Sequence, residues 1–300
     1  MGAKPDQTAI GVGSLIAVTV VWAFSFGLIG KALVDHDPIV IGVIRLLAAL
    51  LCFAPFLRLR KISPRSFVEL AVLGALQFGV MYVCYLTSFQ YLEAWQVALF
   101  SALTPLWVAA IDAAIRKRFE IRFFLAAALS VTGAVAIRAE SVPEGNFFKG
   151  FLLMQVANIA FAGGQVWFRE WKFRNPDRLE REVFGVLYGG ALLFTVLAGL
   201  ISGSFSQFPQ LTASQWGIVL YLGVVASGLG FFFWNFGASR VSAGFLAASN
   251  NLLVPLGVFV AIWINNSKPD WISLSLGSVL IGVSLLLGQK RSSKPVDLNP

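Results

Sequence analysis

Two stretches of the chain, 150 residues apart, have the same character: residues 94–111 read AWQVALFSALTPLWVAAI and residues 244–261 read GFLAASNNLLVPLGVFVA. Each is an apolar run long enough for a membrane span, with one internal proline, Pro105 or Pro255. A helix-interior proline removes a backbone hydrogen bond, which lipid tolerates only where protein or water satisfies the freed carbonyl groups. Paired interruptions in two halves are the best sequence indication of a transporter's binding site. We therefore expect hinges at both prolines.

The composition is that of an integral membrane protein. Of the 300 residues, 57% are hydrophobic and 13% are charged, whereas soluble domains have about 25% charged residues. The net charge of +8 would suggest nucleic acid as a partner of a soluble protein, but here the basic residues lie in short loops between apolar runs. The single histidine and two separated cysteines form no metal-ligand pattern. We expect no nucleic-acid partner, no metal and no cofactor.

Hydropathy divides the chain into ten segments of membrane-spanning length. Their approximate bounds are 10–30, 39–57, 67–89, 94–115, 121–137, 150–167, 183–203, 216–236, 244–264 and 271–287. With the amino terminus in the cytoplasm, 18 Lys and Arg residues fall on the cytoplasmic side and four on the other. This asymmetry follows the positive-inside rule. We therefore expect a multi-pass protein of the bacterial inner membrane with both termini cytoplasmic.

The ten spans divide into two sets of five, and an odd number of spans inverts the second set relative to the first. Landmarks recur in the same order, because AFSFG at 23–27 corresponds to AFAGG at 160–164 and Pro105-Leu106 corresponds to Pro255-Leu256. We expect an all-α fold of two inverted five-helix repeats around a central cavity, with a cytoplasmic tail. The expected ranges are 1–140, 141–290 and, for the tail, 291–300. Substrate sites of such transporters lie near the midplane between the repeats.

Polar residues within the spans are the candidates for a substrate site, because an unpaired polar group facing lipid costs several kcal/mol. In the third span, Gln77, Met81, Tyr85 and Ser88 recur on one helical face. Our substrate-binding candidates are Trp22, Arg45, Gln77, Tyr85, Thr104, Asn158, Gln165, Asn235, Asn250 and Asn251. The alternative for each polar group is a hydrogen bond between helices. For Asn250 and Asn251, just before Pro255, it is the capping of carbonyl groups exposed at the kink.

Arg45 is the one basic residue well inside a span, seven residues into the second. A guanidinium group there could bind a substrate carboxylate or phosphate. It could instead bind carbonyl groups at a helix end, or Glu93 at the outer rim. No Asp, Glu or His lies in the middle of any span. We therefore expect facilitated diffusion or exchange of neutral, zwitterionic or anionic solutes rather than proton-coupled export of cationic drugs.

The chain resembles a ten-helix member of the drug/metabolite transporter superfamily with two EamA-type domains. The resemblance is carried by VVWAFSFGLIGK in the first span, IGVIRLLAALL in the second, TPLWVAAI with its partner VPLGVFVAI, and the glycine-bearing fifth and tenth spans. It implies a cavity lined by spans one, three, four, six, eight and nine, with alternating access through the third–fourth and eighth–ninth helix hairpins. Relatives with different substrates share an arginine in the second span, which favours a structural role for Arg45.

We expect a secondary transporter, working without ATP, that exports small metabolites, above all amino acids or related amine and carboxylate solutes. A flippase for lipid or lipid-linked substrates needs the same symmetric fold and is the alternative. A membrane enzyme is disfavoured because it would need carboxylate or histidine clusters at a membrane face, and we identify no catalytic residues. The fifth and tenth spans are almost free of polar side chains, so they face lipid or a second protomer in a homodimer.

Overall fold

The computed structural model describes residues 7–33, 35–92, 94–138, 147–206, 209–265 and 270–289. These residues form helices and connecting turns, without a strand. By length and composition, nine of the helical segments can cross a membrane, and a tenth, Ile121–Ile137, is apolar but shorter. The ten expected segments are therefore all present. The boundary between the expected domains, near residue 140, and the tail 291–300 lie outside the described residues.

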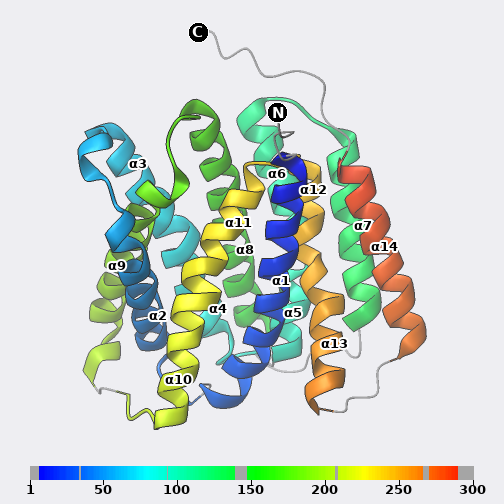
Figure 1. The fold of residues 1–300 in the computed structure, drawn as a ribbon. Coiled ribbons are helices and arrows are strands. Elements are labelled where there is room, and N and C mark those ends of the chain that lie inside the picture. Colours follow the sequence, from blue (N-terminus) through cyan, green and yellow to red (C-terminus); the bar gives the residue numbers. More distant parts are fainter. Residues whose placement is uncertain are drawn as a thin grey trace, which may run out of the picture.

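Each repeat contains five spans, of which the third and fourth are built from more than one helix (Figure 1). The first repeat consists of α1 (Gln7–Ala32), α2 (Pro38–Phe53), α3 (Pro64–Gly74) with η3 (Ala75–Val80) and α4 (Met81–Ser88), α5 (Ala94–Ser101) with α6 (Thr104–Arg116), and α7 (Ile121–Arg138). The second consists of α8 (Phe147–Arg174), α9 (Glu180–Ser202), α10 (Ala213–Tyr221) with η5 (Leu222–Leu229) and α11 (Gly230–Ala238), α12 (Ala243–Ser249) with η6 (Asn250–Leu252) and α13 (Leu253–Asn265), and α14 (Trp271–Gln289). Short 3₁₀ turns follow α2 at Ala54–Phe56 and Leu59–Lys61, and follow α9 at Ser204–Ser206.

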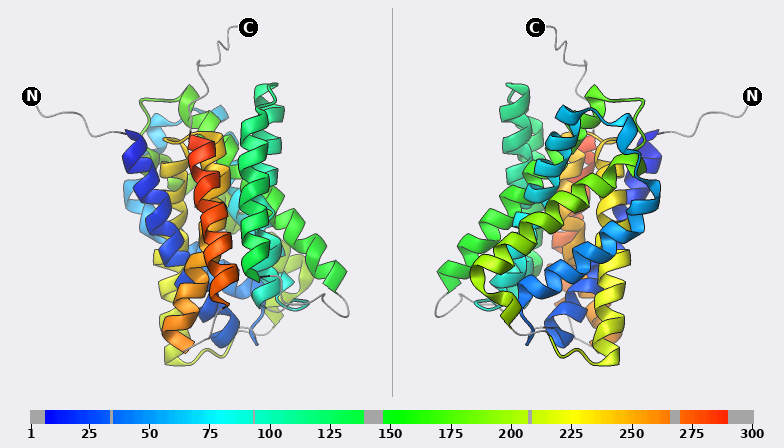
Figure 2. Two further views of the ribbon diagram at one scale, coloured as in Figure 1. Left: turned by 90° about the vertical axis from the view of Figure 1, so that its right-hand side faces the viewer. Right: turned by 90° about the vertical axis from the view of Figure 1, so that its left-hand side faces the viewer.

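The second repeat is inverted relative to the first. In Figure 1, α1 runs downward from the end of the bundle where α14 finishes, whereas α8 runs upward toward that end. Helix contacts follow the same symmetry, because α4 packs on α8 as α11 packs on α1, and α6 packs on α8 as α13 packs on α1. The views in Figure 2 show α7 and α14, the last span of each repeat, side by side. We call the end of the bundle that holds Gln7 and Gln289 the terminal end.

The fourth and ninth spans are broken at the places where the prolines predict interruptions. The helix α5 ends at Ser101 and α6 begins at Thr104, with Pro105 in its first turn. In the ninth span, a 3₁₀ turn separates α12 from α13, and Pro255 is the third residue of α13. Both prolines are buried. Neither therefore faces the lipid, and the carbonyl groups freed at both breaks lie inside the protein.

The third and eighth spans each contain a π-helical segment, η3 and η5, which the sequence periodicity did not reveal. A π-helical turn holds one extra residue and therefore rotates the side chains that follow it relative to those before it. For this reason Gln77, inside η3, does not share a face with Tyr85 in α4. The uniform helical spacing that we assumed for this span was wrong across η3.

Candidate functional site

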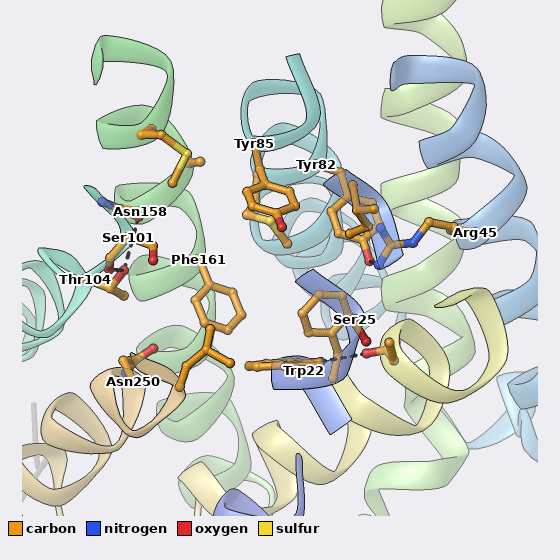
Figure 3. Close-up of a pocket in the computed structure, with 17 residues that line it drawn as sticks. Trp22, Ser25, Arg45, Tyr82, Tyr85, Ser101, Thr104, Asn158, Phe161 and Asn250 are labelled. Carbon is orange, nitrogen blue, oxygen red and sulfur yellow. Dashed lines mark hydrogen bonds between the residues drawn. The ribbon is translucent and has the colours of Figure 1, made fainter. Parts of the chain in front are cut away.

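A cavity of about 780 Å³, including its open side, lies between the two repeats. Its walls come from the first, third, fourth, sixth, eighth and ninth spans, the six that the family resemblance implies, and from Arg45 of the second. The cavity lies toward the end opposite the terminal end, since its lining residues occupy the last part of α1, from Trp22 to Ile29, and the first part of α8, from Met154 to Phe161. Figure 3 shows these side chains surrounding an open space.

Arg45 forms one wall of the cavity with Tyr82. The arginine is 4% exposed, and its Nη2 donates to the Tyr82 hydroxyl at 2.7 Å. Its Nε and Nη2 also donate to Ser227 Oγ, at 3.3 and 3.2 Å. The Ser227 hydroxyl donates to the Leu222 carbonyl at 2.6 Å, so it accepts from the Tyr82 hydroxyl, 2.7 Å away. These bonds hold the guanidinium group between the second, third and eighth spans.

The remaining nitrogen of this guanidinium group, Arg45 Nη1, is buried and has no hydrogen-bond partner. Among the ion pairs of the described residues, none includes Arg45. The structural partners expected for Arg45 were helix-end carbonyl groups or Glu93. Its hydrogen bonds go to two hydroxyl groups instead, and Glu93 lies outside the described residues. The cavity therefore holds a buried cationic group with an unused donor.

Hydroxyl and amide groups form the opposite wall, at the breaks in the fourth and ninth spans (Figure 3). Thr104 Oγ1 donates to the Ser101 carbonyl at 2.6 Å and lies 3.1 Å from Asn158 Oδ1. The Asn158 amide donates to the Phe100 carbonyl at 2.8 Å. In the ninth span, the Asn250 amide donates to Leu246 O at 2.8 Å. These side chains cap carbonyl groups at the breaks and also line the cavity.

Aromatic rings close the cavity between its two polar walls. Trp22 Nε1 donates to the Ala226 carbonyl in η5 at 2.8 Å, which fixes the indole ring. The ring centroids of Phe161 and Phe231 lie 5.9 and 5.3 Å from that of Trp22, both in edge-to-face contact. Such contacts add to the apolar burial of each ring. The cavity is thus a mainly apolar space with a cationic group on one side and neutral polar groups on the other.

Six of the ten predicted substrate-binding residues line the cavity, and four do not. The six are Trp22, Arg45, Tyr85, Thr104, Asn158 and Asn250. The other four are buried behind it: Gln77 donates to Asn235 at 3.2 Å, Gln165 accepts from Trp234 Nε1 at 2.9 Å, and Asn251 donates to Ala102 O at 3.0 Å. These four make the interhelical hydrogen bonds that were the alternative to a binding role.

Sequence reasoning did not single out several residues that line the cavity, of which Tyr82 is the most important because it bonds Arg45. Tyr82 lies one residue away from the face that contains Met81 and Tyr85, so helical periodicity alone gave no signal for it. The contact of Ser227 with Arg45 joins residues 182 positions apart, so it leaves no local pattern in the sequence.

The terminal end of the bundle is closed by a network of ion pairs. Asp112 near the end of α6 accepts from Arg169 of α8 at 3.2 Å and from Arg116 at 3.0 Å. Arg169 also donates to Val241 O in the turn before α12. Nearby, Arg240 pairs with Glu180 at 2.8 Å. The network joins the fourth, sixth, seventh, eighth and ninth spans on the side where the cavity is absent.

The fold and the site are those of a multi-pass membrane protein with a cavity between inverted repeats. The model of the EamA-like transporter family matches residues 9–139 and 149–288. A probable biotin transporter of Pseudomonas aeruginosa is 41% identical over 273 residues, which cover 90% of this chain and 95% of the relative. The biotin transporter of Escherichia coli K12 is 38% identical over 289 residues, covering 94% and 96%. The chain belongs to the EamA-like transporter family, a family of transporters and not of enzymes.

Two more distant proteins are similar to this chain along nearly its whole length. A probable terminal-alkyne amino-acid exporter of Streptantibioticus cattleyicolor is 22% identical over 291 residues, which cover 94% of this chain and 96% of the exporter. A protein crystal structure superposes with a TM-score of 0.74 at 16% sequence identity and covers 95% of this chain and 98% of its own. At this identity the structural match concerns the fold alone.

Proposed function

We propose that this protein transports biotin across the bacterial inner membrane. The observation that carries the proposal is the composition of the cavity: one buried cationic group, aromatic and aliphatic walls, and hydroxyl and amide groups opposite. Biotin combines a carboxylate, an apolar chain and sulfur ring, and a ureido group. The names of the relatives that are about 40% identical agree with this substrate.

The second candidate substrate class is the amino acids and related amine or carboxylate solutes that the sequence predicted, moved outward. Arg45 would suit their carboxylate equally well. An amino acid also brings an ammonium group, however, and no described Asp or Glu side chain lines the cavity to pair with it. The relative named as an amino-acid exporter is only 22% identical. Biotin, which has no ammonium group, is therefore the better match.

Transport would proceed by alternating access between the two repeats. Both termini would lie in the cytoplasm, as the charge asymmetry predicts, so the ion pairs of the terminal end would close the cytoplasmic side in this conformation. Opening that side requires the hairpins of the third–fourth and eighth–ninth spans to move. Pro105 and Pro255, at the breaks of the fourth and ninth spans, are the proposed hinges. The breaks leave few backbone hydrogen bonds to disrupt there.

The proposal is tested by counterflow in proteoliposomes. Vesicles loaded with unlabelled biotin should accumulate labelled biotin, while those loaded with amino acids should not. Ala157, which lines the cavity, and Val156, its lipid-facing neighbour with 45% exposure, give a matched pair. We expect Ala157→Leu to reduce biotin counterflow at least tenfold and Val156→Leu to leave it within twofold. Exchange of amino acids without exchange of biotin would overturn the proposal in favour of the second candidate.

A homodimer stays a prediction for the face formed by α7 and α14. The outer side of this face is apolar, with Ile272 80% exposed and Leu286 69% exposed. Lipid tails cover such a surface as well as a second protomer does, because both are apolar. Light scattering of the protein in nanodiscs would distinguish the two, since a dimer doubles the protein mass per disc.

A further inference from the structure

We propose that Arg45 binds the carboxylate of the transported solute through Nη1, and that this contact sets the direction in which the solute lies in the cavity. The carboxylate would lie at the Arg45–Tyr82 wall and the polar ring of the solute at the Thr104–Asn158 wall. The inference rests on the proposed function, because it assigns the two ends of biotin to two groups of residues.

The first step is the state of the guanidinium group. Arg45 is always charged, lies within the membrane-spanning part of the bundle and is 4% exposed. A buried cation without a counter-charge is costly in such a place. The hydrogen-bond partners of Arg45 among the described residues are the neutral hydroxyl groups of Tyr82 and Ser227. A solute carboxylate would supply the missing negative charge.

The second step is which donors of the guanidinium group are already used. Nε and Nη2 of Arg45 both donate to Ser227, and Nη2 also donates to the Tyr82 hydroxyl. The edge of the guanidinium group formed by these two nitrogens is therefore fixed to the protein. Nη1 is the nitrogen left without a partner. Because two spans hold the group in place, little side-chain freedom is lost when a ligand binds. A charge-assisted bond to carboxylate in this apolar cavity is also stronger than one in water.

The third step is the opposite wall, which suits a neutral polar ring rather than a second carboxylate. A ureido group offers two N–H donors and one carbonyl acceptor. The Asn250 amide nitrogen is used on Leu246 O, which leaves its Oδ1 to accept, and Figure 3 shows this oxygen directed into the cavity. Asn158 Oδ1 has a second lone pair besides the one facing Thr104. Two acceptors on one wall match two ureido N–H groups.

The rival explanation is that Arg45 only connects three helices. Substrate selectivity separates the two roles, because a structural role affects all solutes alike. We would compare biotin with biotinamide, in which a neutral carboxamide replaces the carboxylate, by competition against labelled biotin and by direct counterflow. The variants are Arg45→Gln, Arg45→Lys and Tyr82→Phe. Tyr82→Phe removes one of the hydrogen bonds that hold the guanidinium group of Arg45 but keeps its positive charge.

We expect wild-type protein to prefer biotin over biotinamide at least tenfold. Arg45→Gln should lower biotin transport to the level of biotinamide while changing biotinamide transport less than threefold, and Arg45→Lys should keep part of the preference. Tyr82→Phe should reduce the rates for both solutes and keep the ratio. An equal loss of both solutes in Arg45→Gln, with the ratio preserved, would overturn the proposal.

Two further outcomes are decisive. If Arg45→Gln does not fold, its place in the test is taken by the ratio of biotin to biotinamide transport in wild-type protein and in Tyr82→Phe. If either protein shows no preference for the solute with the carboxylate, the proposed bond between Arg45 and the carboxylate is overturned. Should wild-type protein transport another solute and not biotin, the proposed function fails. The proposed bond between Arg45 and the carboxylate is then tested on that solute and its neutral amide with the same variants. A ratio of transport of the two solutes that Arg45→Gln leaves unchanged refutes the bond.

Discussion

Two adjacent glycines in α9 provide a sharp test of how closely the repeats are packed. A Cβ atom added to Gly190 would lie 2.0 Å from the carbonyl oxygen of Ala71 in α3, whereas one added to Gly189 would meet no heavy atom within 4 Å. The contact is reciprocal, since a Cβ on Gly74 of α3 would lie 1.9 Å from Leu187 O. The obstructing atoms belong to the backbone, which cannot move aside by changing a rotamer.

The expected cost of Gly190→Ala follows from this geometry. Ordinary contact begins at 3.4 Å, so the two helices would have to separate by about 1.4 Å locally. Overpacking of a tight interface costs typically about 1–3 kcal/mol, and the rigid backbone places this case at the upper end. The higher helix propensity of alanine returns about 1 kcal/mol. We expect a net destabilisation of about 2 kcal/mol for Gly190→Ala and a stabilisation of up to about 1 kcal/mol for Gly189→Ala.

Thermal unfolding of the two purified variants in the same detergent measures the difference. About 3 kcal/mol in a chain of this size corresponds to an apparent Tm lower by roughly 5 °C for Gly190→Ala than for Gly189→Ala. Transport of biotin, the proposed substrate, should fall with it, because α3 leads through η3 into α4, which carries Tyr82 and Tyr85 to the cavity. Equal Tm values for the two variants would refute the close packing of α3 on α9.

Three further outcomes are expected. Asp112→Asn leaves the buried Arg169 without its anionic partner and should lower the free energy of unfolding by about 3–5 kcal/mol. Glu182→Gln breaks an ion pair with an exposed lysine and should lower it by at most about 1 kcal/mol. Thermal unfolding of the two variants measures the difference. Trp22→Phe keeps an aromatic ring at this position but loses the hydrogen bond to Ala226 O, so counterflow of biotin should fall several-fold while the protein remains folded. An unchanged rate would exclude a positioning role for that bond. Counterflow should persist without a pH gradient, because the described residues lining the cavity include no acid or histidine, and strict dependence on a proton gradient would contradict this.

Much of the fold could be predicted from the sequence because a bilayer permits few solutions. Apolar runs of about 20 residues must be spanning helices, and two prolines in corresponding runs must interrupt them. Pro105 and Pro255 thus located the broken spans correctly. The same reasoning missed η3 and η5, since the insertion of one residue into a helical turn changes neither hydropathy nor composition.

The candidate site was only partly predictable, for a related reason. Polarity within a span indicates that a side chain faces protein, but it does not distinguish a cavity from a helix contact. Gln165 and Asn158 are both polar residues of α8; one accepts from Trp234 in the core, and the other lines the cavity. What decides between them is the shape of the neighbouring helices, above all at the breaks in the fourth and ninth spans.

The symmetry of the fold and the asymmetry of the site serve different needs. Inverted repeats can exchange conformations, so a symmetric scaffold allows the cavity to open on either side in turn. A symmetric set of side chains, however, would bind a solute in two opposite directions. The corresponding positions, 150 residues apart, differ here: Tyr82 in the third span, which bonds Arg45, matches Phe232 in the eighth, and Thr104 before the proline of the fourth span matches Val254 in the ninth. Polar groups in one repeat thus correspond to apolar groups in the other. Such a site favours one orientation of a solute that has a charged end, as the biotinamide comparison will test.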